Sequence, residues 1–358
     1  MSSSSPPRRR PPRRVLVVDD SELMRRLLRS IIDEADDFEV VAEADNGYQA
    51  IRLVHEQDPE IVTLDIQLPD LGGLETLAYI MSEAPRPVVI VSSHTALLSD
   101  FQAVEYGAVE VVSKPAAGEP HPREALKQVL LPALRAAALA RVGNLGVRLP
   151  RAGRGARRPA VRESGRAVQC AVAIAASTGG PRALSELIPR LPADLPAAVL
   201  VVQHMPPLFT RSLAQRLNEL SALPVQEAVA GDVVRGGRVY LAPGGRHLRL
   251  ARRDGAVVLS LTDSDPVWGV RPAADILFHS VAEHLGPHSL GVVLTGMGRD
   301  GAEGLRAIRA VGGWTAVQDE ESAVIASMPK AAAPYASEVL TLESMAARIA
   351  EQALRRDS

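Results

Sequence analysis

The sequence has little of several features that mark particular classes of protein. Aromatic residues make up 3% of the 358 residues, so the hydrophobic cores must be built mainly from leucine, valine, isoleucine and alanine. The single cysteine, Cys170, excludes an internal disulfide and is typical of a reducing compartment. The formal net charge of −2 gives the molecule as a whole no field that would attract nucleic acid.

Long apolar runs are missing as well. No segment reaches the roughly 18 apolar residues that a helix needs to span a bilayer, so we expect no membrane insertion. Residues 1–13 are mostly serine, proline and arginine and lack the apolar core of a signal peptide, which predicts a disordered tail. Together these absences predict a cytoplasmic protein, and the chain length favours two domains.

Apolar strands and helices alternate five times in the first third of the chain. The predicted strands cover residues 15–18, 39–42, 61–64, 88–91 and 109–112, and the helices after the first four cover 21–32, 48–55, 74–82 and 96–106. This alternation predicts a parallel sheet with helices on both faces.

Charged residues follow three of these strands. Asp19 and Asp20 come after the first strand, Asp65 after the third and Lys114 after the fifth. Because the carboxyl ends of parallel strands lie on one rim, we expect these groups to converge. Three carboxylates suit Mg²⁺, and a lysine beside them can hold a phosphoryl oxygen. The alternative is a set of unrelated charges, which would scatter in type and position.

This stretch resembles a response-regulator receiver domain. The matching residues are Asp19-Asp20, the run from Asp65 to Pro69, Ser92 and Lys114-Pro115. The resemblance implies a flavodoxin-like domain over residues 14–131, in which a histidine kinase phosphorylates Asp65 and Asp19 and Asp20 help to hold Mg²⁺. It also implies that Ser92 and Lys114 sense the phosphoryl group and that the helix face at Tyr106 responds. Gly72-Gly73 departs from the Asp-Gly pair that is common in the family, which we expect to alter a loop only.

A helical pattern follows from about residue 115 to 141, with an interruption at Pro132. Residues 141–166 are then rich in arginine, glycine and proline, with Glu163 as the only acid. This composition predicts a linker over residues 132–167. A basic patch for nucleic acid is the alternative, but the segment lacks interleaved aromatics and amphipathic spacing.

The second domain, residues 168–356, begins with an apolar run that ends in Ser177-Thr178-Gly179-Gly180-Pro181. This pattern predicts a buried strand, a sharp turn and a helix with Pro181 at its first position. The N–H groups at such a helix start suit either a phosphate or a developing oxyanion. Further strand and helix signals predict a doubly wound, mostly parallel α/β domain, with a β-hairpin excursion between residues 225 and 261.

Three residues with complementary chemistry follow three different strands of this domain. Ser177, His204 and Asp300 can meet at one rim, where the histidine would take the serine proton and the aspartate would orient the imidazole. We expect N–H groups near Thr178 and Met297 to stabilise the oxyanion. Taken singly, Ser177 and Asp300 could each be no more than a helix cap.

Five segments of this domain are similar to the C-terminal domain of chemotaxis protein-glutamate methylesterases. They are residues 176–180, 203–212, 240–244, 277–282 and 294–301. The resemblance implies hydrolysis of glutamate methyl esters on chemoreceptors with release of methanol, deamidation of receptor glutamines as a second activity, and no cofactor for the hydrolysis. It places Arg271 in the substrate region, with a surface ion pair as an equal alternative. Ala175 replaces the family's usual glycine, and its methyl group is expected to crowd the turn slightly.

The order of receiver, linker and hydrolase implies that the unphosphorylated receiver covers the active-site rim until Asp65 is phosphorylated. Two other functions are alternatives. A nucleotide-binding oxidoreductase would need G-x-G-x-x-G, where this chain has Ala175 and Gly179-Gly180. A DNA-binding response regulator would need a small helix-turn-helix output rather than a large α/β domain.

Overall fold

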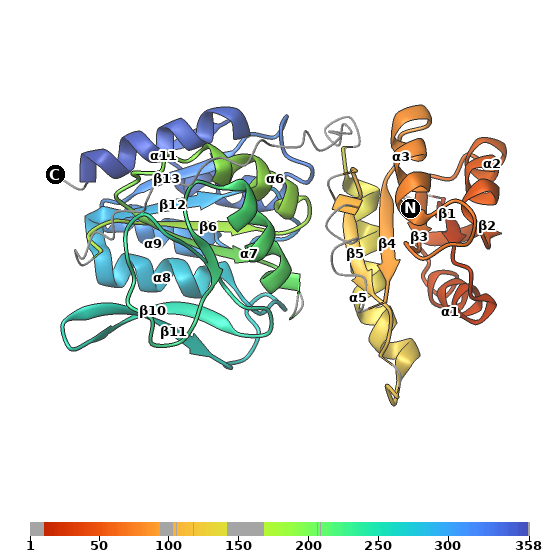
Figure 1. Ribbon diagram of the computed structural model, residues 1–358, viewed down its shortest axis with the longest axis horizontal. Helices are drawn as coiled ribbons and strands as arrows, with labels where there is room; N and C mark the ends of the chain where they lie inside the picture. The colour runs from red at the N-terminus through yellow and green to blue at the C-terminus, as the bar shows by residue number, and fades with distance from the viewer. Residues whose placement is uncertain are drawn as a thin grey trace, which may run out of the picture. The chain divides into compact units, whose positions relative to one another are not determined.

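The computed structural model describes residues 11–93, 103–104, 106–116, 118–141, 168–205, 207 and 209–356. The chain divides into two compact units, Met1–Leu149 and Pro150–Ser358 (Figure 1). The predicted tail up to residue 10, most of the predicted helix 96–106 and the predicted linker from residue 142 to 167 lie outside the described residues. Among the described helices, none is both long and apolar enough to cross a membrane.

The first unit is built on a five-stranded parallel sheet with strand order β2-β1-β3-β4-β5, which is the flavodoxin-like order. Helices α1 and α5 pack against each other, as do α2 and α3. The strands are β1 (Arg13–Val18), β2 (Phe38–Ala44), β3 (Ile61–Leu64), β4 (Val88–Ser92) and β5 (Glu110–Ser113), and the helices are α1 (Glu22–Ile32), α2 (Gly47–Gln57), α3 (Gly73–Glu83) and α5 (Pro122–Leu139).

The local sequence explains these elements. Strand β3 is buried along its whole length, as expected for a central strand that is covered on both faces. Ser21 caps α1 by accepting a hydrogen bond from Met24 N at 3.3 Å, which confirms the predicted cap. The same helix buries Leu28 and Ile32 and leaves Leu23 exposed to solvent, so it has one apolar face.

The predicted interruption at Pro132 is wrong, because α5 passes through this proline and ends at Leu139. A proline inside a helix removes one backbone hydrogen bond. Here the residues beyond it remain packed, since Leu134 and Ala137 are fully buried. The helix therefore extends past the predicted domain boundary at residue 131, and the first residues of the predicted linker, up to Leu139, belong to α5.

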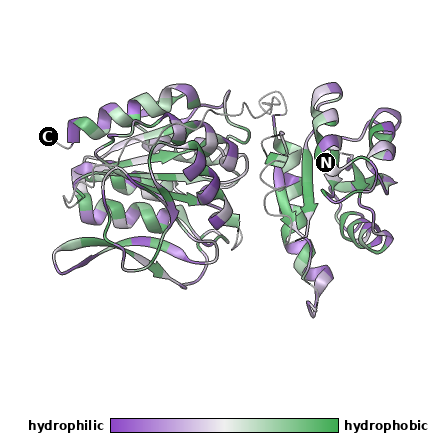
Figure 2. Cartoon of the chain, in the orientation of Figure 1, coloured by the Kyte–Doolittle hydropathy of each residue, from purple (hydrophilic) through white to green (hydrophobic). Residues whose placement is uncertain are grey.

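The second unit contains a seven-stranded parallel sheet with strand order β14-β13-β12-β6-β7-β9-β8. Its strands are β6 (Ala171–Ala176), β7 (Ala198–Gln203), β8 (Val225–Glu227), β9 (Val239–Leu241), β12 (Ser289–Val293), β13 (Trp314–Gln318) and β14 (Glu338–Leu340). Its helices are α6 (Gly180–Leu187), α7 (Phe209–Leu220), α8 (Ala274–Leu285), α9 (Ala302–Ala310), α10 (Ser327–Ala332) and α11 (Leu342–Arg356). Helices α6 and α11 lie on one face of the sheet and α8 and α9 on the other (Figure 1). The apolar strands run between these layers (Figure 2).

The predicted hairpin excursion between residues 225 and 261 is only partly right. Strands β10 (His247–Arg253) and β11 (Ala256–Thr262) form an antiparallel hairpin that packs on α8. Strands β8 and β9 instead join the main sheet as parallel strands at one edge. Three-residue strands carry too little alternation to reveal their partner, so their place was decided by tertiary packing.

The strand order of the second sheet reverses at β6. The chain runs from β6 to β7, β8 and β9 on one side and then returns to β12 on the other side of β6. In open α/β sheets, ligands bind where the strand order reverses in this way. The loops after β6 and β12 therefore mark the place to look for chemistry.

Candidate active site

Ser177 is the first residue after β6, at this reversal point. Its N–H donates to Thr295 O at 3.0 Å, and its carbonyl accepts from Gly180 N at 2.7 Å. Gly179, which has a φ of 77°, turns the chain sharply. Helix α6 begins at Gly180, so Pro181 is its second residue and not its first as predicted. The backbone that carries the hydroxyl is thus held from both sides.

His204 follows β7, the neighbouring strand. Strand register pairs Ala176 with Gln203, so Ser177 and His204 are the next positions along two adjacent strands. His204 N also donates to Ala176 O at 3.1 Å. No hydrogen bond joins the Ser177 hydroxyl to the imidazole among the described residues, although such bonds commonly tighten only when substrate binds.

Asp300 lies on the loop after β12 and contacts the histidine directly. His204 Nε2 and Asp300 Oδ2 are 2.7 Å apart, and the Asp300 side chain is almost fully buried. Its carboxylate also accepts from Ala274 N at 2.6 Å and from Asp275 N at 3.0 Å. These N–H groups open α8, where a negative charge is favoured. Asp300 therefore caps α8 and not the helix that follows it, α9.

The contact with Asp300 decides which imidazole nitrogen can act as a base. A carboxylate only accepts hydrogen bonds, so Nε2 of His204 carries the ring proton that points at Asp300. Nδ1 then keeps its lone pair and can accept a hydrogen bond. The sequence alone could not have distinguished the two nitrogens.

Gln203 joins the backbones of Ser177 and His204, a contact that the sequence pattern did not indicate. Its side chain is fully buried, and Nε2 donates to Ser177 O at 2.9 Å and to His204 O at 3.2 Å. One amide thus ties together the backbones of the serine and the histidine. The available signal was a polar residue at the end of a wholly apolar strand.

Asp275 is the second missed residue. Its Oδ1 accepts from Gly301 N at 3.0 Å and Gly304 N at 2.7 Å, and its Oδ2 accepts from Trp268 Nε1 at 2.8 Å. Burial raises the pKa of the Asp275 carboxyl above its usual value, against the opposite effect of the bonds from Gly304 and Trp268. Asp275 anchors the loop that carries Asp300.

The predicted oxyanion residues lie on both sides of Ser177. A Cβ built on Gly296 would overlap the sulfur of Met328 and lie 2.7 Å from Ser177 Cβ, so the loop after β12 approaches the serine as only glycine allows. Met297 follows this glycine and is partly exposed, and within the described residues no acceptor is assigned to its N–H. Thr178 is buried, and its carbonyl accepts from Thr295 Oγ1 at 3.0 Å.

The structure shows the contacts of Arg271 and the place of Ala175 in the chain. Arg271 Nη1 donates to the carbonyls of Asp263 and Ser264 at 3.0 and 3.1 Å, so it braces a loop, and among the described residues it forms no ion pair. Ala175 lies inside β6 rather than in the turn, and a Cβ on Gly301 would lie 3.2 Å from its methyl group. The extra methyl is therefore accommodated in the strand.

The first unit gathers its predicted acids as expected. Ligand oxygens of Asp19, Asp20 and Asp65 lie within 4.8 Å of one another, which suits a divalent cation. Lys114 Nζ lies 2.7 Å from Asp19 Oδ2 and 2.6 Å from Asp65 Oδ2. Burial raises the pKa of Asp19. Burial also acts to lower the pKa of Lys114, but its bonds to Asp19 and Asp65 outweigh this and raise it.

Ser92 is buried at the end of β4, and its carbonyl accepts from Lys114 N at 2.7 Å, which places it beside the lysine. Tyr106 is half-buried in a turn rather than in a helix. A Cβ on Gly73 would overlap the carbonyl of Asp65, whereas one on Gly72 would meet only the flexible Glu75 side chain. The Gly72 departure is thus harmless to the acid cluster.

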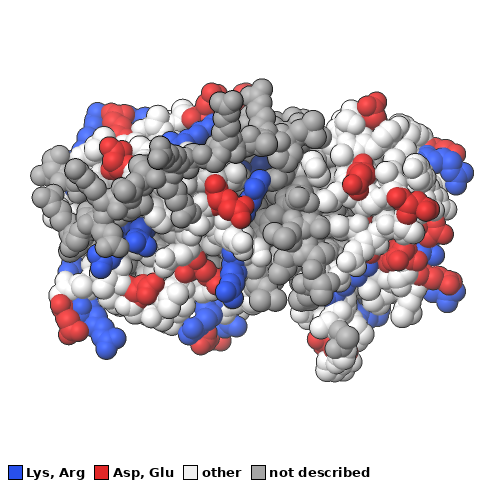
Figure 3. Space-filling view, in the orientation of Figure 1, with Lys and Arg blue, Asp and Glu red and all other residues white. Residues whose placement is uncertain are grey.

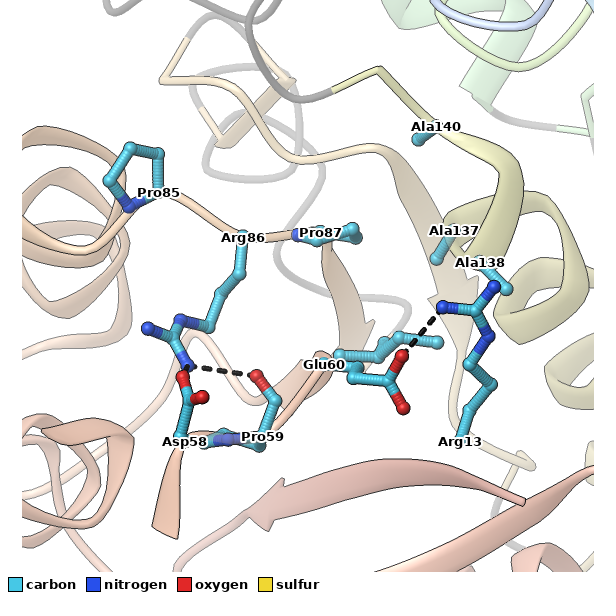
Figure 4. A pocket seen from close by; sticks show the side chains of 11 residues that line it. Arg13, Asp58, Pro59, Glu60, Pro85, Arg86, Pro87, Ala137, Ala138 and Ala140 are labelled. Carbon is cyan, nitrogen blue, oxygen red and sulfur yellow. Dashed lines mark hydrogen bonds and ion pairs between the residues drawn. The ribbon is translucent and has the colours of Figure 1, made fainter. Parts of the chain in front are cut away.

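A hollow of about 350 Å³ lies at the opposite, amino-terminal edge of the same sheet (Figure 4). Its two arginines are already neutralised, because Arg13 pairs with Glu60 at 2.6 Å and Arg86 pairs with Asp58 at 3.3 Å. It contains none of the predicted site residues. On the face shown in Figure 3, basic and acidic side chains of the described residues are interspersed, which does not favour a nucleic-acid surface.

Comparisons with known proteins match both units of the chain. A family model described as CheB methylesterase matches residues 172–349, and one described as response regulator receiver domain matches residues 15–124. The chain is 43% identical over 311 residues to a protein-glutamate methylesterase/protein-glutamine glutaminase of Pyrococcus horikoshii, covering 86% of this chain and 84% of the relative. It is 45% identical over 336 residues to the protein of that name from Symbiobacterium thermophilum, covering 90% and 92%.

A solved structure shares the fold of the second unit. The crystal structure of the Thermotoga maritima CheB methylesterase catalytic domain aligns with a TM-score of 0.50 and 42% identity. It covers 52% of this chain and 99% of that domain.

Proposed function

Because this chain belongs to the family of CheB methylesterases that carry a response regulator receiver domain, we propose that Ser177, His204 and Asp300 carry out its hydrolytic reaction. The observation that carries the proposal is the 2.7 Å contact between His204 and a buried Asp300, at the strand end beside Ser177. The two rival functions, a nucleotide-dependent oxidoreductase and a DNA-binding regulator, do not fit this family.

The reaction is the hydrolysis of glutamate γ-methyl esters on chemoreceptors. Nδ1 of His204 takes the proton of the Ser177 hydroxyl while the oxygen attacks the ester carbonyl. The imidazolium returns the proton to the departing oxygen, and methanol leaves. Water, activated by the same nitrogen, then cleaves the acyl-enzyme and releases a glutamate carboxylate. With a glutamine side chain the same steps release ammonia.

Three groups stabilise the charges that develop during the reaction. Asp300 stabilises the imidazolium and fixes the ring orientation through Nε2. The N–H of Met297 and one near Thr178 stabilise the oxyanion, and the close approach of Gly296 to Ser177 brings that loop within reach. Arg271 has no step in this mechanism.

The first unit regulates the hydrolase. Asp65 accepts a phosphoryl group from a histidine kinase, and Asp19, Asp20 and Asp65 would hold Mg²⁺, which would supply positive charge to the phosphoryl oxygens. Lys114 would then exchange a carboxylate partner for a phosphoryl oxygen, and the neighbouring Ser92 would move with it. This change relieves the block on the hydrolase. Such an enzyme, acting on the inner side of its receptors, works in the cytoplasm.

Ser177→Ala tests the proposal most directly. Methanol release from methylated receptor membranes should fall by at least 10³-fold, because no nucleophile remains. Ser185→Ala on α6 serves as the matched control and should release methanol at the wild-type rate. Wild-type turnover by Ser177→Ala would reject the assignment.

A further inference from the structure

A tryptophan stands at the rim of the active site in an uncommon backbone position. Val267 and Val270 exchange two backbone hydrogen bonds, of 3.2 and 3.1 Å, across a two-residue turn. Both central residues have positive φ, 55° at Trp268 and 79° at Gly269, as in a type I′ turn. The first central position of such a turn favours asparagine, aspartate or glycine, so a bulky aromatic there is strained.

Trp268 is held by a side-chain hydrogen bond but is not buried. Its Nε1 donates to Asp275 Oδ2 at 2.8 Å, and Asp275 N donates to Asp300. A single residue, Asp275, therefore links the indole to Asp300. Trp268 nevertheless remains 52% exposed. A strained backbone that presents a large apolar ring to solvent beside a catalytic aspartate is poorly explained by stability alone.

The side chain of Arg299 lies over the Trp268 ring. The guanidinium carbon of Arg299 lies 4.6 Å from the centroid of the Trp268 ring, in cation–π distance. Arg299 directly precedes Asp300, and its side chain is 55% exposed. Among the described residues it pairs with Glu303, which is 3.9 Å away and pairs more closely with Arg306, at 2.8 Å. The charge of Arg299 is therefore left largely available to a ligand.

We propose that Trp268 and Arg299 form a docking platform that binds a carboxylate of the receptor segment beside the ester under attack. Stacking on the indole orients the guanidinium and leaves its N–H edge free for two parallel bonds to a carboxylate. Each turnover produces a glutamate carboxylate, so the substrate segment becomes acidic as the reaction proceeds. This inference rests on the proposed function and adds to it how the enzyme distinguishes a receptor from a small ester.

Trp268→Asn is the sharpest test, since asparagine suits a type I′ turn better than tryptophan does. The full-length variant should keep or exceed the wild-type Tm. We expect KM for methylated receptor to rise about tenfold, and the ratio of kcat/KM on receptor to kcat/KM on N-acetyl-glutamate γ-methyl ester to fall by a similar factor. An unchanged ratio would overturn the platform, and an equal loss of kcat/KM on both substrates is one way in which the ratio stays unchanged.

Arg299→Ala should lower the same ratio and should weaken the dependence of receptor KM on salt, because the carboxylate contact is screened by ions. Arg249→Ala, a change of an exposed arginine on β10, is the control and should keep the wild-type ratio. If Arg299→Ala keeps the wild-type salt dependence, the platform is wrong. If the wild type itself releases no methanol from receptors, the proposed function fails, and the platform with it.

Discussion

Asp300 caps the helix that contains Asp275, and Asp275 in turn caps the helix that follows Asp300. Asp300 accepts from the first N–H groups of α8, which contains Asp275, and Asp275 accepts from Gly301 and Gly304 at the start of α9. Two buried carboxylates are thus held side by side by four backbone N–H groups. This arrangement satisfies both helix starts and presents one oxygen of Asp300 to His204.

Asp275→Ala should therefore damage both stability and catalysis. The N–H groups of Gly301 and Gly304 would lose their acceptor, at a cost of about 1–3 kcal/mol in the free energy of unfolding. Because the loop that carries Asp300 would loosen, kcat should fall. Denaturant unfolding and methanol-release kinetics measure the two effects, and Glu283→Ala, an exposed change on the same helix, should show neither.

Gln203→Leu should lower kcat about tenfold to a hundredfold, because the carbonyls of Ser177 and His204 would lose their shared donor. Gln203→Glu should not restore activity, since a carboxylate cannot donate to either carbonyl. Steady-state kinetics on receptor membranes provide the measurement. The exposed Gln215→Leu on α7 is the control, and wild-type kcat in Gln203→Leu would show that the bridge is dispensable.

Gly296→Ala should inactivate the enzyme with only a modest loss of stability. The new methyl group would overlap the sulfur of Met328 and press on Ser177 Cβ. Adding Met328→Ala removes the first of these contacts and leaves the second. We expect the double variant to regain Tm but not kcat, and recovery of both would mean that Ser177 is not displaced.

Asp65→Ala should leave basal esterase activity low and unresponsive to a small-molecule phosphodonor, because the side chain that accepts the phosphoryl group is gone. Methanol release with and without the phosphodonor measures the response. Asp36→Ala, an exposed change in the same unit, should respond as the wild type does. Equal activation of Asp65→Ala and wild type would refute the assignment of Asp65.

The contribution of Glu34, in the turn between α1 and β2, to the stability of the fold should decrease in acid. Hydrogen bonds from Lys127 and Arg123 of α5 lower the pKa of Glu34 from 4.5 to about 2. A carboxyl with a lowered pKa stabilises the folded state above its unfolded pKa, and this contribution is lost as the pH falls from about 4.5 towards 2. Thermal unfolding of the full chain should show a smaller drop in Tm over that range in Glu34→Gln than in wild type. Parallel curves would contradict this.

The sequence by itself determined which residues end the strands. Apolar runs that stop at Ser177, His204, Asp65 or Lys114 can be found without coordinates, because buried strands exclude such groups until the chain reaches the rim. The parallel arrangement followed from the alternation of strands and helices, so the convergence of Asp19, Asp20 and Asp65 was predictable, and the structure confirms it.

Tertiary structure decided which partner each polar group has. Nothing local to Gln203 or Asp275 indicates that one bridges two strands or that the other anchors a distant loop, because those bonds join residues 26 to 29 positions apart. The same holds for β8 and β9, for the continuation of α5 through Pro132 and for the bonds of Arg271 to a neighbouring loop. Local pattern measures burial and backbone preference, whereas hydrogen-bond partners and edge pairings depend on segments that only folding brings together.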